Sequence, residues 1–261
     1  MNWLWWSVLL TGFCPLGRAW RANRRTALRY AVGWAVAAWA GWAAAALAAA
    51  VRPGADGGLT AYLALCLTGC AGVAVLGARR PGAGAWNFVV AGLLAVLLLP
   101  VARGLGVPRP EPWHLAFLGV TLAVGVVNYL PTRLSLAVLF AAAGCGVEVA
   151  RLAAVGPAGE FAGRALLALA PWVGWVVVSG APAPAAEFDR LWLAYRDRFG
   201  LVWGQRMREQ FNQAAANAGW PVVLTWQGLA ATAGSAPPPG PQAVATLQAV
   251  LKRFGPEEGA P

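Results

Sequence analysis

Glu148 is the residue whose type and position first suggest chemistry. It is the only acidic residue inside a predicted membrane crossing, and Arg151 follows three positions later on the same helical face. A carboxylate inside a bilayer is costly, so it is a candidate proton relay or cation ligand. A carboxylate within reach of an arginine forms a structural ion pair instead. The spacing favours an ion pair of Glu148 with Arg151, and a transport role is the alternative.

The other residue types that commonly carry chemistry lack the partners they need. His114 is the only histidine, which leaves a zinc or haem site short of ligands. The cysteines are Cys14, Cys66, Cys70 and Cys145, and three of them lie in apolar runs typical of small buried residues. There is no phosphate-binding glycine loop and no C-x-x-C or H-E-x-x-H pattern. We therefore expect no cofactor, no metal site and no enzymatic activity.

A run of small residues predicts a helix-packing seam in the first crossing. Small residues let two helix backbones approach closely, and dispersion then holds the helices together in lipid. The seam fits either a homodimer or partner subunit, or another helix of the same chain, which we favour. Ala142 and Gly146 of the fifth crossing are the expected internal partners. The seam residues recur at every fourth position and are Gly33, Ala37, Gly41 and Ala45.

An aromatic stripe marks the polar C-terminal part of the chain. Residues 187–218 show a charge-rich amphipathic helical pattern, and beyond Gly200 the apolar positions drift around the helix, which predicts a kink or a second contact surface there. We expect the stripe to dock on a partner or on the membrane face. The docking stripe consists of Phe188, Trp192, Tyr195 and Phe199.

The elements that must position these residues follow from the composition. Of 261 residues, 59% are hydrophobic and 11% are charged, against about 25% charged in soluble domains. This excludes an ordinary soluble enzyme, a disordered chain and a fibre, and it predicts an all-α integral membrane protein. All basic residues except Lys252 are arginines, and the net charge is +10. This bias is typical of a GC-rich bacterial genome. Arginines of a membrane protein concentrate in its cytoplasmic loops, so we expect them to contact anionic lipid headgroups and not nucleic acid.

Six apolar segments are long enough, or nearly so, to cross a bilayer at about 20 residues each. The third and sixth are the shortest, and Pro171 is expected to kink the sixth. The turn 128–133 (NYLPTR) ends one crossing and caps the next, and a binding role for it is the alternative. The Trp-rich segment 2–10 is too short to span and is expected to lie in the interface. The six segments are Ala27–Val51, Leu59–Ala78, Trp86–Val101, Trp113–Leu130, Leu134–Val155 and Ala165–Val178.

The arginines also predict an orientation. With the N-terminus inside, 15 basic residues lie on the inner side and 5 on the outer side. The positive-inside rule then places both termini on the cytoplasmic side of a bacterial inner membrane. The chain divides into an interfacial and basic segment (1–26), the bundle (27–178), a linker (179–186), an amphipathic helix with a short extended piece (187–230), a second linker (231–242) and a terminal helix (243–261).

Three functional classes fit this organisation. We favour a non-enzymatic membrane subunit or scaffold, because the crossings contain few polar residues. A small transporter or channel that uses the bundle interior around Glu148 is the first alternative, and an intramembrane enzyme is the second. A carrier of polar solutes needs groups that replace water along its path. The candidates for such groups are Thr68, Asn87, Thr121, Asn128 and Glu148.

Overall fold

The structure is a computed structural model that describes residues 2–51, 58–79, 81–103, 110–153, 160–180, 184, 186–232 and 240–254. The described residues are mostly helical, with one ribbon of two short strands. The helices of the apolar part are α1 (Asn2–Thr11), α2 (Phe13–Asn23), α3 (Arg29–Val51), α4 (Gly58–Ala74), η1 (Val75–Gly77), α5 (Ala83–Leu97), α6 (Leu99–Arg103), α7 (Pro112–Tyr129), α8 (Ser135–Leu152) and α9 (Glu160–Gly180).

Five helical segments are long and apolar enough to cross a membrane, so the chain has the features of a polytopic membrane protein. They are Arg29–Val51, Gly58–Gly77, Pro112–Tyr129, Ser135–Leu152 and Ala162–Gly180. The expected third crossing differs, because α5 is shorter and ends at Leu97. Pro100 lacks an N–H and its ring crowds the preceding turn, so the helix is interrupted at Leu98 before α6 begins. The sixth segment, by contrast, continues through Pro171.

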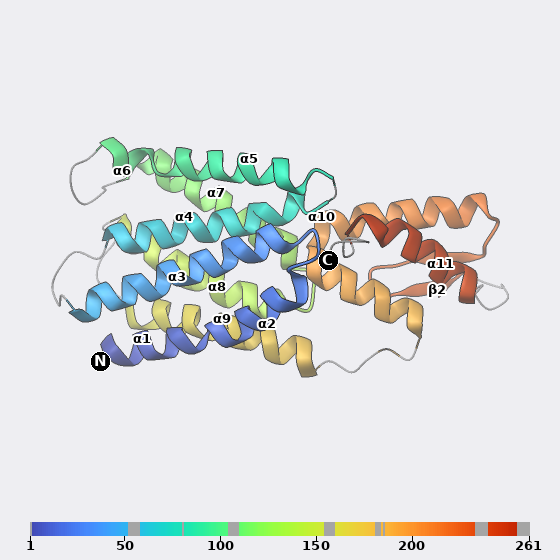
Figure 1. Ribbon diagram of the computed structural model, residues 1–261, viewed down its shortest axis with the longest axis horizontal. Helices are drawn as coiled ribbons and strands as arrows, with labels where there is room; N and C mark the ends of the chain where they lie inside the picture. Colours follow the sequence, from blue (N-terminus) through green and yellow to red (C-terminus); the bar gives the residue numbers. More distant parts are fainter. Residues whose placement is uncertain are drawn as a thin grey trace.

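The long helices run side by side along one axis, and α4 lies among α3, α5 and α7 (Figure 1). α8 and α9 form a second closely packed pair. Small residues permit these close approaches: a Cβ on Gly72 would lie 2.9 Å from the Cα of Gly125, and one on Gly144 would lie 2.9 Å from the carbonyl oxygen of Gly163. Backbone-to-backbone packing of this kind is typical of membrane helices.

The predicted seam in α3 packs within the chain, but not against the helix we expected. A Cβ on Gly41 would lie 3.2 Å from the Cα of Ala64 in α4, and Gly33 faces the ring of Trp20 in α2. Gly146 of α8 is exposed with no atom near its would-be Cβ. The pairing of the seam with Ala142 and Gly146 is therefore wrong, because α4 lies against Gly41 and α2 lies against Gly33.

The N-terminal helices pack lengthwise on the bundle. Both α1 and α2 contact α3 and α9, and they follow α3 from one end of the bundle towards the other (Figure 1). Trp39 of α3 lies over Gly12, where a Cβ would be 2.6 Å from Cε2 of its indole ring. Its indole nitrogen donates a 2.8 Å hydrogen bond to the Leu9 carbonyl.

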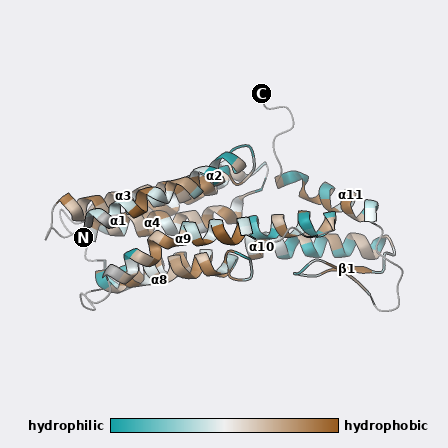
Figure 2. Ribbon diagram, turned by 90° about the horizontal axis from the view of Figure 1, so that it is seen from below, coloured by the Kyte–Doolittle hydropathy of each residue, from teal (hydrophilic) through white to brown (hydrophobic). Residues whose placement is uncertain are grey.

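The C-terminal part of the chain forms a more polar unit at one end of the bundle (Figure 2). It contains α10 (Glu187–Asn217), β1 (Val222–Leu224), β2 (Leu229–Ala231), α11 (Gly240–Leu251) and η2 (Lys252–Phe254). The predicted kink is confirmed at Gly200, and the predicted extended piece is the antiparallel ribbon of β1 with β2. Most of the expected linker 231–242 lies outside the described residues, as do residues 181–183 and 185 of the linker 179–186.

Candidate functional site

The junction between the bundle and the C-terminal unit is organised around Asn128, the penultimate residue of α7. Its side chain is 1% exposed. The amide nitrogen donates to the Phe199 carbonyl over 3.3 Å, and the amide oxygen accepts the Val202 N–H over 3.1 Å. A helix break leaves such backbone groups without intrahelical partners. One buried side chain of the bundle therefore satisfies both sides of the break in α10.

Glycine is the only residue type that fits the helix break at position 200. Its backbone angles are φ 77° and ψ −163°, a region that is essentially restricted to glycine. A Cβ at this position would also lie 2.6 Å from both the side-chain Cγ and the backbone oxygen of Asn128. The conformation and the close approach both require the hydrogen atom that glycine carries in place of a side chain.

A buried ion pair continues the junction beside Asn128. The Asp197 carboxylate accepts hydrogen bonds from Nε and Nη2 of Arg196, at 3.0 and 2.7 Å. It also accepts the backbone N–H of Arg133 over 3.2 Å, and the Arg133 guanidinium lies 3.6 Å from its other oxygen. The Asp197 carboxylate thus interacts with one cation of each part of the chain, Arg196 and Arg133, and charge strengthens such hydrogen bonds. It therefore fixes the turn after α7 to the C-terminal unit.

Trp226, just after β1, closes the junction from the other side. Its indole donates a 2.6 Å hydrogen bond to the Pro131 carbonyl in the same turn. Its own carbonyl accepts from Arg196 at 2.8 Å and from the Trp192 indole at 3.3 Å. The hydroxyl of Tyr129 adds a 2.9 Å bond to the Arg198 carbonyl. The turn 128–133 is thus a contact surface for the C-terminal unit of the same chain.

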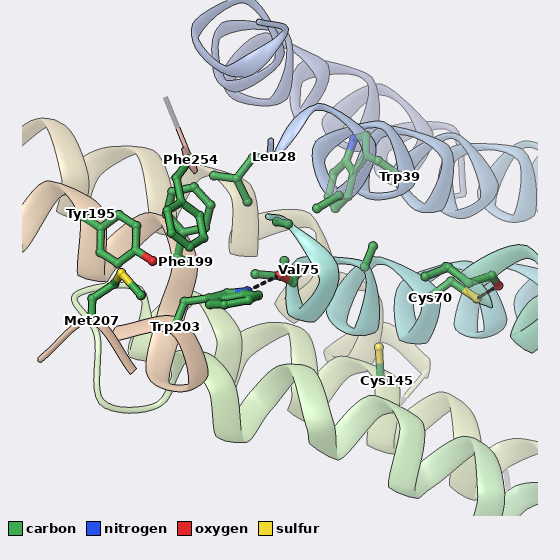
Figure 3. Close-up of a cluster of buried hydrophobic side chains, with 14 of the residues drawn as sticks. Leu28, Trp39, Cys70, Val75, Cys145, Tyr195, Phe199, Trp203, Met207 and Phe254 are labelled. Atoms are coloured by element: carbon green, nitrogen blue, oxygen red, sulfur yellow. Dashed lines mark hydrogen bonds between the residues drawn. The ribbon is translucent and has the colours of Figure 1, made fainter. Parts of the chain in front are cut away.

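Phe254 lies among aromatic side chains where the C-terminal unit meets the bundle (Figure 3). Its ring packs on Tyr195, Phe199 and Trp203 at centroid distances of 5.2, 5.0 and 5.2 Å. Its carbonyl accepts the N–H of Ala27, ahead of α3, at 3.5 Å. The Trp203 indole donates to the Val75 carbonyl at the end of α4 over 3.1 Å.

Tyr195 is the titratable group of this aromatic cluster. Its side chain is buried, and its hydroxyl has no hydrogen-bond partner within the part of the chain that the structure describes. Burial raises the pKa of Tyr195 above its ordinary value, and the nearby Arg79 guanidinium opposes the rise. The folded chain therefore favours the neutral form of the Tyr195 side chain.

The predicted docking stripe lies inside this unit and is not an exposed surface. Phe188, Trp192, Tyr195 and Phe199 are all buried. Phe188 packs on Phe211 of the second half of α10, with 5.1 Å between ring centroids. The periodicity correctly indicated a buried face, but the chain itself covers that face because α10 folds back at Gly200. The expectation that a partner docks on these side chains is therefore wrong.

The intramembrane pair has the geometry of a structural ion pair. Glu148 is 2% exposed, and its Oε2 accepts a 2.9 Å hydrogen bond from Nε of Arg151. Cys66, Cys70 and Cys145 are buried as expected, whereas Cys14 is exposed. Within the described ranges, no three His, Cys, Asp or Glu side chains gather in a way that could hold a metal ion.

A groove of about 600 Å³ with polar and apolar lining residues lies on the C-terminal unit. One wall is the second half of α10, with Arg208, Glu209 and Gln213, and the other is β1. Asn212 joins the walls, because its side chain accepts the Leu224 N–H at 2.6 Å and donates to the Leu224 carbonyl at 3.2 Å. The Asn212 amide thus bonds backbone groups of β1 in the way that a neighbouring strand would.

Comparison of the chain with protein-family models, with curated proteins and with solved structures gave no match. Sequence reasoning placed Gly200 at a kink and the turn 128–133 at the end of a crossing. It missed the bonds of Asn128 to Phe199 and Val202, and the contacts of Asp197, Trp226 and Phe254. Two signals were available: the apolar stripe drifts around the helix beyond Gly200, and the turn 128–133 carries four polar side chains that need partners.

Proposed function

We propose that this polytopic membrane protein is a non-enzymatic membrane subunit or scaffold that holds its C-terminal unit in a fixed position at the membrane face. The observation that carries the proposal is the junction. Asn128, Asp197 and Trp226 each bond across it, and each of these groups is at least partly buried. A unit tied by buried polar bonds has a defined orientation relative to the bundle.

The five polar residues named as candidates for a solute path support a scaffold over a carrier, because each of them already has a partner in the chain. Asn87 accepts from the Trp34 indole at 2.8 Å, and Thr68 accepts from the Trp42 indole at 3.1 Å. Thr121 bonds its own helix backbone at 2.8 Å. Asn128 serves the junction and Glu148 pairs with Arg151. Groups that already bond within the chain are not lined up to replace water around a solute.

The charge distribution supports a cytoplasmic location for the C-terminal unit. Arg24, Arg25, Arg79 and Arg133 lie in the turns at the end of the bundle where the unit is attached. The positive-inside rule assigns such a face to the cytoplasm. We further propose that exposed arginines at this end contact anionic lipid headgroups, each contributing about 1 kcal/mol near the surface.

The test is purification in a mild detergent followed by mass spectrometry of the intact assembly. A subunit is expected to carry a stoichiometric partner, and the partner should be lost in Asn128→Ala, which disrupts the junction. Asn87→Ala is the matched control, since it removes an asparagine of the bundle whose bond to Trp34 lies away from the junction. A chain that is always isolated without a partner would contradict the proposal.

Glu148→Gln separates the scaffold from the carrier. The substitution keeps the shape of the side chain and removes its charge. A scaffold should retain the same assembly and the same cellular phenotype. A proton-coupled carrier should lose uptake after reconstitution, and that result would favour transport instead.

A further inference from the structure

The N-terminal helices α1 and α2 form one nearly continuous rod. They contain 10 and 11 residues and are joined by Gly12, whose backbone is helical at φ −61° and ψ −18°. Hydrogen bonds from Gly12 to Leu9 at 3.1 Å and from Leu16 to Gly12 at 3.4 Å continue the helix through the joint. Pro15 interrupts the regular bonding because it has no N–H. At about 1.5 Å per residue the rod is about 33 Å long, close to the thickness of the hydrocarbon core at about 30 Å.

The contacts with α3 fix the direction of this rod. Gly12 lies against Trp39, and Trp20 lies against Gly33. Residue numbers therefore increase along the rod in the direction in which they decrease along α3, so the rod and α3 are antiparallel. Continuing this register brings the first turn of α1 level with the last turns of α3. Figure 1 shows the N-terminus at the end of the bundle opposite the C-terminal unit.

The rod also has a second neighbour, which excludes a helix resting on the membrane surface with one face in lipid. The Trp172 indole of α9 donates to the Thr11 hydroxyl over 3.3 Å, and Arg18 lies 5.2 Å from the centroid of the Trp175 ring. Leu9 is buried between the helices. We infer that the segment Asn2–Asn23 crosses the membrane beside α3, so the N-terminus and the C-terminal unit lie on opposite faces.

The charges of the segment fit this placement. Residues 2–17 carry no charge, and Arg18, Arg21 and Arg24 follow at the end that meets the C-terminal unit. The uncharged stretch is about 24 Å long at 1.5 Å per residue, slightly less than the hydrocarbon core. Arg18 can extend its charged end to the interface along the Trp175 ring, and local thinning covers the remainder. The exposed Trp3 at the other end is suited to the opposite headgroup layer.

This inference replaces our sequence-based expectation that residues 1–26 lie on the same side as the C-terminal unit. It concerns the two ends relative to each other and does not depend on the scaffold role. The sequence-based expectation rested on the shortness of the apolar segment 2–10, whereas the contacts of both α1 and α2 with α3 and α9 favour a crossing.

The experiment is labelling of single introduced cysteines with a membrane-impermeant maleimide in spheroplasts, before and after permeabilisation. The full-length chain with Cys14→Ala is the background, because the other cysteines are buried. Asn2→Cys reports the N-terminus, and Ala218→Cys reports the exposed surface of the C-terminal unit. Ala153→Cys, exposed at the far end of α8, is the control for the opposite face.

We expect Asn2→Cys and Ala153→Cys to be labelled at least tenfold faster in intact spheroplasts than Ala218→Cys, which should react only after permeabilisation. Protection of Asn2→Cys together with Ala218→Cys would overturn the inference. Protection of Asn2→Cys in both states would overturn it as well. Labelling of Ala218→Cys alone in intact spheroplasts would keep the inference and contradict the cytoplasmic placement. Trp3→Cys replaces Asn2→Cys if that variant does not accumulate.

Discussion

Gly200→Ala is expected to open the junction between the bundle and the C-terminal unit. The backbone angles at this position cost an alanine about 1–3 kcal/mol. The new methyl group must also displace Asn128, from whose Cγ it would be 2.6 Å away, and the two hydrogen bonds lost contribute about 1 kcal/mol each. The total of about 3–5 kcal/mol lowers the ratio of closed to open junction by roughly two to four powers of ten.

Amide hydrogen exchange in mild detergent measures this opening directly, with the Val202 N–H as the reporter because it bonds the Asn128 side chain. The matched control is Gly219→Ala, where φ is 67° but no atom lies within 4 Å of the would-be Cβ. It should cost only about 1–2 kcal/mol of local strain. Equal exchange in the two variants would refute the reasoning, since the contact with Asn128 would then contribute nothing. Adding Asn128→Ala to Gly200→Ala should give a clearly non-additive change.

Three further changes test other parts of the structure. Tyr195→Phe should stabilise the chain by about 1 kcal/mol, because it removes a buried hydroxyl without a partner. Since burial raises the pKa of Tyr195, the wild type should lose stability as the pH rises above about 10, the ordinary tyrosine value, and the variant should lose less in thermal unfolding scans. Arg151→Met should destabilise by about 3 kcal/mol by leaving the buried Glu148 carboxylate unpaired, and Glu148→Gln by clearly less; equal losses would refute the ion pair. Gly41→Leu should lower the melting temperature in detergent and Gly146→Leu should not, because only Gly41 faces a neighbouring helix.

The elements of the bundle were largely predictable because long apolar runs have few ways to satisfy their backbone in lipid other than as helices. The prediction of the third crossing failed because of one residue. Pro100 interrupts an apolar run that looks continuous from Trp86 to Val101, and the helix divides into α5 and α6. Hydrophobic length alone does not report such a break, whereas the position of a proline within the run does.

The candidate site was less predictable, because its bonds join residues far apart in the chain. Asn128 and Phe199 are 71 positions apart, and Trp226 and Pro131 are 95 positions apart. A helical periodicity shows that one face of α10 is buried, but it does not show what covers that face. For the aromatic stripe the cover is the chain's own second half-helix and Phe254, and this depends on the fold-back at Gly200.

Three tryptophans make hydrogen bonds that, like those of the candidate site, depend on the fold and not on the local sequence. Three indoles donate to carbonyls where regular helical bonding ends: Trp39 to Leu9 before the Gly12 joint, Trp203 to Val75 at the end of α4, and Trp226 to Pro131 after α7. The Leu9 and Val75 carbonyls each also accept a backbone N–H, from Gly12 and Ala78, so the indole adds a second donor there. A long rigid donor can thus reach from a neighbouring element while its ring packs between helices. Each of these three indole–carbonyl bonds is therefore a fixed contact between two elements far apart in the sequence, and such a contact depends on the fold and not on the local pattern.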